Sequence, residues 1–389
     1  MYKPPDYFQL DDLLNEEHRL IRTSVRQWVD RVVKPEIDKY AQKHKPLPKE
    51  QMRQMGELGA LGSFIPETYG GAGLDYISYG LIMCELERGD TAVRSTASVQ
   101  SSLVMYPIFA FGNEEQRQKY LPRLASGEWV GAFGLTEPNH GSDPGGMLSH
   151  FEDNGDHLLL NGSKMWITNS PICDLAVVWA KNENGEVKGL IVERGLEGFT
   201  TPEIANKWSL RASSTGELVF DNVKVPKENL LPNIQGMKGP LMCLNSARYG
   251  IAWGVLGAAM ECYDTALQYS LQRKQFNKPI ASFQLQQKKL AEMLTEITKA
   301  QLLAWRLGVL KNEDKATPAQ ISMAKRNNVE MALKIARDSR QILGAMGISG
   351  DFPIMRHMMN LESVITYEGT HDIHLLITGA DITGISAFD

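Results

Sequence analysis

The chain has 389 residues, of which 43% are hydrophobic and 22% charged, and its formal net charge is −5. This composition excludes extensive disorder, and the length is sufficient for two or three packed domains. The 41 basic and 46 acidic residues form no basic stripe, which argues against nucleic-acid binding, because such binding depends on many cationic contacts to phosphate. We therefore expect a small-molecule partner and no nucleic acid.

Targeting and redox signals are weak. No run approaches the roughly 20 apolar residues that span a bilayer, so we expect no membrane insertion. The first residues lack the apolar core of a signal peptide and are too acidic for a transit peptide, which predicts a cytoplasmic protein, or one of the mitochondrial matrix if a transit peptide has been removed. The 4 cysteines are scattered and contain no C-x-x-C pair, so they predict neither a disulfide framework nor a zinc site.

Three sequence patterns follow one another along the chain. From about 14 to 127, apolar residues recur at spacings of three and four, which predicts helices. From 130 to about 232, short β-rich runs are divided by Asn-Gly, Gly and Pro turn signals. After Met237 the helical period returns over long segments joined by short links, which is typical of an antiparallel bundle. We predict an α+β fold with an N-terminal helical domain (1–129), a middle antiparallel β domain (130–236) and a C-terminal four-helix-bundle domain (237–389).

Several candidate motifs for cofactor or metal binding match the sequence only incompletely. Gly71 and Gly73 begin a G-x-G-x-x-G pattern that lacks its third glycine and follows no predicted strand, so it is no dinucleotide fingerprint. Glu368 and His371 have the E-x-x-H spacing of di-iron bundles, but no second copy occurs. His371 and His374 are better explained as structural histidines. We expect no metal.

Two segments in the β-rich region combine turn formers with polar groups. The run Phe133–Asp143 is dense in backbone donors and hydroxyls, and by itself it is most simply a surface turn. Trp166–Asn169 closes a predicted strand shortly afterwards and places a large aromatic plane beside a hydroxyl. Together the two segments suit a flat ring with a polar edge.

In these segments the sequence resembles the acyl-CoA dehydrogenases, whose flavin lies against an F-G-L-T-E-P-x-x-G-S-D loop and a W-I-T strand. The likeness extends over essentially the whole chain and includes the family's α, β, α order. It implies FAD as the cofactor. The contacts that it implies from this part of the chain are Phe133, Leu135, Thr136, Gly141, Ser142, Trp166, Ile167 and Thr168.

Two C-terminal motifs extend the resemblance. Arg273–Phe276 with Gln284 matches the family's R-x-x-F element, and Gln341–Gly347 matches its Q-x-L-G-G-x-G turn, with Ala345 in place of the second glycine. In the family these elements come from a neighbouring subunit and hold the pyrophosphate and adenine of FAD, so the resemblance implies a homotetramer. An arginine offers phosphate a fixed positive fork, and glycine permits close main-chain approach. The implied contacts are Arg273, Phe276, Gln284, Gln341, Leu343, Gly344 and Ala345.

The run Thr366–His374 carries the reactive group that the resemblance implies. By position alone, a glutamate before a glycine is as consistent with an exposed loop acid as with a base. The resemblance implies that Glu368 is the catalytic base, with Thr370 and Asp372 beside the flavin. Removing an α-proton from a thioester needs a carboxylate whose pKa is raised by a desolvated pocket, and donors that polarise the carbonyl.

Arg94 is the residue that indicates which substrate the chain would bind. Taken alone, it is most simply a helix residue in a surface ion pair. Within the family, the sequence resembles the members that oxidise glutaryl-CoA, which implies that the distal carboxylate pairs with Arg94 and accepts from Ser95, while Glu87 orients the arginine and Tyr367 donates. It also implies that 241–248 line the CoA passage, with Arg248 near the CoA phosphate or adenine. The implied substrate contacts are Glu87, Arg94, Ser95, Ser142, Leu241, Asn245, Arg248, Tyr367 and Gly369.

The implied activity is FAD-dependent oxidative decarboxylation of glutaryl-CoA to crotonyl-CoA and carbon dioxide, with electrons leaving through an electron-transferring flavoprotein. An alternative of the same class stops at glutaconyl-CoA or acts on another short acyl-CoA. A catalytically silent flavin-containing binding protein and a cofactor-free helix bundle are alternatives of other classes. The net charge of −5 and the presence of Glu368 weigh against the silent binding protein.

Overall fold

The first third of the chain is helical, in agreement with its periodicity. The structure is a computed structural model that describes residue 2 and residues 4–388. Asn15 begins the first long helix by accepting a hydrogen bond from the His18 amide at 2.8 Å. The helices of this part are α1 (Glu16–Trp28), α2 (Ile37–Lys43), α3 (Lys49–Glu57), α4 (Tyr76–Gly89), α5 (Thr91–Ser98), α6 (Tyr106–Phe111) and α7 (Glu114–Ala125). A π-helical segment, Val99–Met105, joins α5 to α6.

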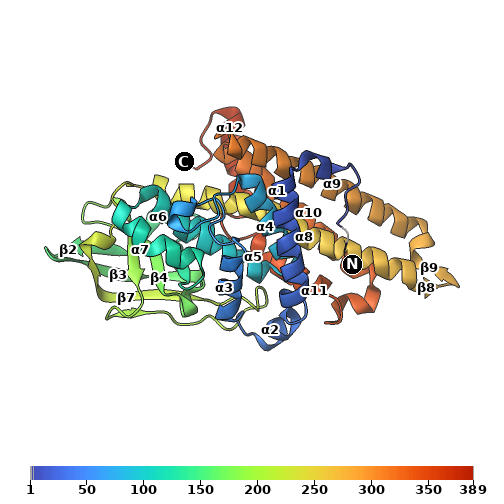
Figure 1. Cartoon of the computed structure of the whole chain (residues 1–389), viewed down its shortest axis with the longest axis horizontal. Coiled ribbons are helices and arrows are strands. Elements are labelled where there is room, and N and C mark those ends of the chain that lie inside the picture. The colour runs from blue at the N-terminus through green and yellow to red at the C-terminus, as the bar shows by residue number, and fades with distance from the viewer. Residues whose placement is uncertain (1, 3, 389) are drawn as a thin grey trace.

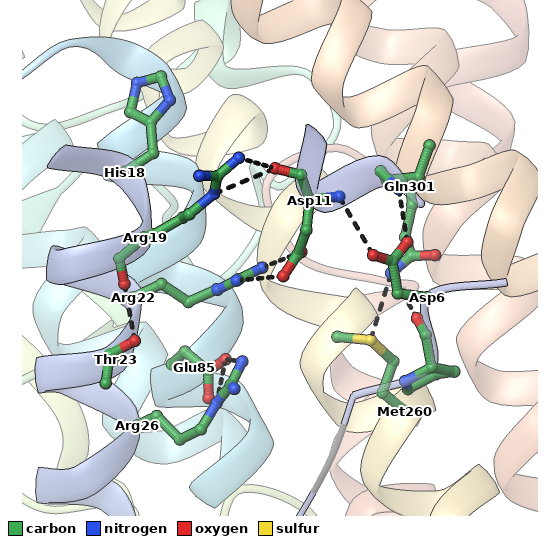
Figure 2. Close-up of polar contacts among 12 residues, drawn as sticks. Asp6, Asp11, His18, Arg19, Arg22, Thr23, Arg26, Glu85, Met260 and Gln301 are labelled. Atoms are coloured by element: carbon green, nitrogen blue, oxygen red, sulfur yellow. Dashed lines mark hydrogen bonds and ion pairs between the residues drawn. The ribbon is translucent and has the colours of Figure 1, made fainter. Parts of the chain in front are cut away.

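Polar contacts fix the residues that precede α1 (Figure 2). The Asp11 carboxylate accepts two bonds from the Arg22 guanidinium of α1, at 2.6 and 2.7 Å. On the opposite side, Gln301 Nε2 donates to the Pro5 carbonyl at 3.3 Å. Beside these contacts, Arg26 of α1 bonds Glu85 of α4 at 2.6 and 3.0 Å. The N-terminal segment is therefore tied to both helical parts of the molecule.

The middle of the chain forms one sheet. Its strands are β1 (Gly131–Gly134), β2 (His150–Asp153), β3 (His157–Thr168), β4 (Leu175–Lys181), β5 (Val187–Glu193), β6 (Phe199–Thr200) and β7 (Thr215–Pro226). The order is β1-β4-β2-β3-β7-β6, with β5 also paired to β4. The prediction of an antiparallel sheet was wrong for β4, which runs parallel to both β1 and β2. Parallel pairing is possible here because the chain passes through β2 and β3 between β1 and β4, which supplies the long connection that parallel neighbours need.

The last part of the chain is helical again. Its elements are α8 (Lys238–Gln272), the short strands β8 (Lys274–Gln275) and β9 (Lys278–Pro279), α9 (Gln284–Asn312), α10 (Pro318–Ile342), α11 (Ile354–Val364) and α12 (His371–Thr383). α8, α9 and α10 pack on one another, and α12 packs along α10. α4 of the N-terminal part packs against α8 and α9, so the two helical parts share one hydrophobic core.

The sheet and the bundle occupy opposite ends of the molecule (Figure 1). Strands β2, β3 and β7 lie at one end, and the β8–β9 hairpin that joins α8 to α9 lies at the other, with α4, α5 and α8 between them. We propose domain boundaries at 129/130 and 236/237, where helix gives way to strand and strand to helix. No helix in the described part of the chain is long and apolar enough to cross a membrane.

Candidate active site

Glu368 lies in the turn between α11 and α12. α12 begins after Thr370, whose hydroxyl accepts from the Ile373 amide at 3.2 Å, so the turn is closed by an N-cap. Glu368 has a positive φ of 55°, and Gly369 follows with φ 95°. A glycine suits the second position because it has no Cβ, whereas a glutamate in this region is strained. The tertiary contacts of the turn must therefore hold it in place.

The environment of Glu368 suits a proton acceptor. Oε2 of this side chain is buried and has no hydrogen-bond partner among the described residues. Burial raises the pKa of the Glu368 carboxyl, although the charges of Arg94, Lys325 and Arg248 act in the opposite direction. A carboxylate with a raised pKa and a free oxygen is a stronger base than an exposed one and can accept a proton from a bound molecule.

Arg94 lies deep beside this carboxylate. Its Nε donates to Glu87 Oε2 at 2.6 Å, both side chains are 0% exposed, and its Nη2 donates to the Tyr367 hydroxyl. Burial acts to lower the pKa of Arg94, but the Glu87 carboxylate and the Tyr367 hydroxyl together outweigh burial, and the pKa is raised. Nη1 has no partner among the described residues. The simplest interpretation of Arg94, a surface ion pair, was wrong, and one edge of a buried guanidinium is available to a ligand.

A buried aspartate ties Arg94 to the helix that precedes Glu368. Asp90 ends α4 and caps α5, accepting from the Ala92 amide at 2.7 Å. Its other oxygen accepts from Asn360 Nδ2 at 2.9 Å and from the Arg356 guanidinium, and both partners belong to α11. Asp90 therefore fixes the position of α5, which carries Arg94, relative to α11, which leads to Glu368.

α8 contributes the next group. Arg248 is 5% exposed, its Nε donates to the Glu368 carbonyl oxygen at 2.8 Å, and its Nη1 donates to Asn245 Oδ1 at 3.2 Å. Nε is therefore turned toward the turn that carries Glu368, and the expectation that Arg248 lies near the CoA phosphate or adenine stays a prediction. Leu241, seven residues earlier, is 41% exposed and remains available to line a passage.

Two residues of this site were missed by the sequence analysis. Gly254 of α8 packs against the buried pair, and a Cβ added there would lie 2.3 Å from Glu87 Oε2. Lys325 of α10 is 1% exposed and donates to the carbonyls of Tyr367 and Gly369 at 3.1 and 2.9 Å. The only sequence signal for Lys325 was its place among the apolar positions of a helix. A lysine in a helix is usually assigned to the solvent-exposed face.

The remaining substrate-site residues surround this centre. Ser95 is 2% exposed on α5, directly after Arg94, and Ser142 is exposed in the loop after β1. His374 of α12 contacts the turn: a Cβ at Gly369 would lie 3.0 Å from its ring. Burial lowers the pKa of His374 to about 3, so the imidazole is neutral.

A second polar surface is formed where β1 and β3 end. Met165 donates its amide to the Thr136 carbonyl at 2.9 Å, which joins the two segments. Trp166 lies at a register shift between β3 and β7, has φ 62°, and is 57% exposed. Gly141 and Ser142 are exposed, and a Cβ at Gly141 would meet no atom within 4 Å. An exposed indole beside an open glycine loop and the partly buried Thr168 hydroxyl fits a flat ring with a polar edge.

A buried ion pair and its hydrogen bonds hold the loop that forms this surface. Lys164 Nζ bonds Glu137 Oε1 at 2.8 Å, and Glu137 also accepts from the Leu148 and Ser149 amides at 2.7 and 2.9 Å. Despite burial, these partners lower the pKa of Glu137 to about 2, so the carboxylate stays ionised. Three predicted contacts, Phe133, Leu135 and Ile167, have side chains in the hydrophobic core, which leaves their main chain for any cofactor contact.

The other predicted cofactor residues lie elsewhere. Arg273, Phe276 and Gln284 are exposed at the β8–β9 hairpin, far from the sheet (Figure 1). Phe276 is 87% exposed, which is unusual for a large apolar side chain. After α10, Gln341, Gly344 and Ala345 are exposed and Leu343 is buried. A single chain therefore does not bring the hairpin and the Trp166 surface together around one ligand.

The chain is similar to known proteins over its whole length. Residues 15–128, 132–223 and 235–383 match the N-terminal, middle and C-terminal domains of acyl-CoA dehydrogenases. The glutaryl-CoA dehydrogenase of Desulfococcus multivorans is 36% identical over 385 residues, which cover 97% of this chain and 99% of the relative.

Two solved structures have the same fold. A glutaryl-CoA dehydrogenase from Mycobacterium smegmatis in complex with FADH2 has a TM-score of 0.97 and 46% identity, covering 100% of both chains. The glutaryl-CoA complex of a glutaryl-coenzyme A dehydrogenase has a TM-score of 0.91 and 36% identity, covering 95% of this chain and 96% of the other.

Proposed function

The chain belongs to the acyl-CoA dehydrogenase family and is an FAD-dependent acyl-CoA dehydrogenase, and we propose that its substrate is glutaryl-CoA, which it oxidises and decarboxylates to crotonyl-CoA and carbon dioxide. The observation that carries this proposal is the buried Arg94 with one unpartnered nitrogen beside Glu368.

The charges of the site support a substrate with a distal carboxylate. Arg94, Arg248 and Lys325 lie within electrostatic reach of Glu368, and Glu87 pairs with Arg94, so full ionisation leaves one positive charge in excess. An apolar acyl end would leave that charge uncompensated in a desolvated site, which is costly. A carboxylate at the end of the acyl chain would accept from Arg94 Nη1. The relatives named for glutaryl-CoA support the same assignment.

We assign the first step to Glu368. Its free carboxylate oxygen would accept the α-proton of the thioester, and bound FAD would supply the acceptor for the β-hydride. Trp166, Thr168 and the 133–142 loop would hold the ring, and Ser142 would touch the thioester arm. Arg248 and Lys325 would keep Glu368 in its left-handed conformation through the main-chain carbonyls.

Decarboxylation uses the same groups. Arg94 and Tyr367 would hold the distal carboxylate so that the breaking C–C bond stands perpendicular to the conjugated plane of the glutaconyl product. Carbon dioxide leaves as its bonding electrons enter the conjugated thioester, and Glu368, now protonated, returns its proton to the terminal carbon. Glu368 is then ionised again, as it was before the first step.

The assembly and the electron acceptor are part of the same proposal. The separation of the β8–β9 hairpin, which Arg273 precedes, from the sheet that carries Trp166 supports a flavin site completed by a second subunit, as in a homotetramer (Figure 1). An electron-transferring flavoprotein would reoxidise the flavin.

Anaerobic titration tests the proposal. Glutaryl-CoA labelled in its distal carboxylate should bleach the flavin absorbance and release labelled carbon dioxide in equal amount. Accumulation of glutaconyl-CoA without carbon dioxide would establish the non-decarboxylating activity instead. Bleaching by butyryl-CoA with none by glutaryl-CoA would overturn the assigned substrate.

A further inference from the structure

Lys325 occupies an unusual position for a lysine. It lies inside α10 with 1% of its surface exposed, and its ammonium group donates to two main-chain carbonyls at 3.1 and 2.9 Å. Among the described residues it bonds to no carboxylate. Removing a cation from water in this way is costly, and an apolar side chain would fill the same position of a helix without that cost.

The two carbonyls that it binds belong to Tyr367 and Gly369, the residues on either side of Glu368. The carbonyl of Glu368 itself accepts from Arg248 Nε at 2.8 Å. Three successive carbonyls are therefore held by two buried cations, which come from α8 and α10. This is the turn in which Glu368 and Gly369 both have positive φ.

We propose that Lys325 is a positioning residue for the catalytic base, which keeps the Glu368 carboxylate aimed at the acyl chain by holding the carbonyls on both sides of it. The proposal rests on the proposed role of Glu368. Without the ammonium group, two desolvated carbonyls would lose their donor, and the turn could relax out of the left-handed region.

The charge of Lys325 adds a second effect. Burial lowers the pKa of Lys325 to about 7, although Glu368 acts to raise it. The other groups that face this cluster are Tyr79 from α4, Arg94 from α5, Arg248 from α8, Tyr367 from the turn, and the neutral His374 from α12. Loss of Lys325 removes one of three cations that favour ionised Glu368. The base should then require a higher pH to ionise.

The variants Lys325→Met and Lys325→Arg test the proposal in the holoenzyme. Lys325→Met should lower the rate of flavin reduction at neutral pH at least tenfold with both glutaryl-CoA and butyryl-CoA, and should move the acidic limb of the pH–rate profile to higher pH. Lys325→Arg should restore most of the rate because it keeps the charge and several donors. If Lys325→Met fails to fold, Lys325→Gln keeps the two N–H donors of an amide without the charge and should show the same displaced limb.

Lys207 provides a matched control. Its Nζ also donates to two main-chain carbonyls, those of Leu210 and Ser213 at 2.7 and 2.9 Å, in the loop before β7. Burial lowers its pKa to about 8. Lys207→Met should therefore resemble Lys325→Met in lost main-chain contacts while leaving the pH–rate profile of the wild type.

Three outcomes would overturn the inference. These are a wild-type rate and profile in Lys325→Met, equal changes in rate and profile in the two methionine variants, and a failure of Lys325→Arg to recover. Glu368→Gln separates this inference from the proposed function. If Glu368→Gln still reduces its flavin, the base itself is misassigned; if it does not, a wild-type Lys325→Met removes only the role of Lys325.

Discussion

Arg94 Nε lies 2.6 Å from Glu87 Oε2, and neither side chain reaches solvent. The break between α4 and α5 at Asp90 brings the two residues onto one side, and Gly254 leaves them room against α8. The pair satisfies one edge of the guanidinium and leaves Nη1 free. An arginine held in this way is ready to bind a carboxylate without moving.

Arg94→Gln should discriminate between substrates. Glutaryl-CoA loses its carboxylate partner, worth about 2 to 5 kcal/mol for a truncated buried pair, whereas pentanoyl-CoA loses none. The ratio of glutaryl to pentanoyl activity should fall at least tenfold in kcat/KM. Because the single change also leaves Glu87 unpaired, the double variant Glu87→Gln, Arg94→Gln is the control: it should show the same change in ratio with a smaller loss of stability. Equal losses on both substrates would make Arg94 a structural residue.

The variant Glu368→Gln should retain bound flavin, but substrate should no longer reduce that flavin. The amide is nearly isosteric with the carboxyl group but cannot accept the α-proton. Stopped-flow absorbance should show a loss larger than the roughly 10² to 10⁴ that general bases contribute. A rate near that of the wild type would show that another group is the base.

The same variant should be more stable than the wild type at neutral pH. Burial raises the pKa of Glu368 in the folded state, so ionisation of this group opposes folding. The stability that it costs is absent below the unfolded pKa and grows as pH rises towards the folded pKa. Thermal unfolding of the holoenzyme should show Glu368→Gln gaining on the wild type as pH increases from acid to neutral, and no such trend would contradict the raised pKa.

Arg273→Ala should weaken FAD retention and loosen the oligomer together. The guanidinium is exposed at a hairpin far from the Trp166 surface, so it would serve a flavin bound across a subunit boundary. Flavin content after gel filtration and mass in solution measure the two effects. Lys274→Ala, on the exposed adjacent residue, should change neither. Stoichiometric flavin and unchanged mass in Arg273→Ala would remove the cross-subunit argument.

Tyr367→Val should separate oxidation from decarboxylation. The Tyr367 hydroxyl contacts the Arg94 guanidinium and would help to orient the distal carboxylate. Without it, the carboxylate would pair more closely with Arg94, which over-stabilises the ionic ground state. Single-turnover product analysis should show flavin reduction with glutaconyl-CoA accumulating in place of crotonyl-CoA. An unchanged crotonyl-CoA yield, or parallel slowing of both steps, would exclude this role.

Local sequence was sufficient for the order of the elements and for the family. The period of three to four along α8 to α10 predicted long helices, and the β-rich runs predicted the sheet. The segments around Thr136 and Trp166 predicted a site for a flat ring, their resemblance to the family implied FAD, and the similarity of the chain to an FADH2-bound relative confirms that cofactor. These features can be read locally because periodicity and short motifs reflect the chain's own geometry.

Tertiary structure decided which polar residues are buried and what they face. Taken alone, Arg94 was most simply a surface residue, and no feature of the sequence indicated that Arg248 or Lys325 contacts the turn of Glu368. Each is buried because helices distant in sequence pack around it, and the partners that offset its burial come from other elements. The parallel pairing of β4 was likewise set by strands far along the chain. Sequence determined the order of the elements, and the family resemblance singled out Glu368, whereas the long-range packing that desolvates Glu368 and surrounds it with cations exists only in the folded chain.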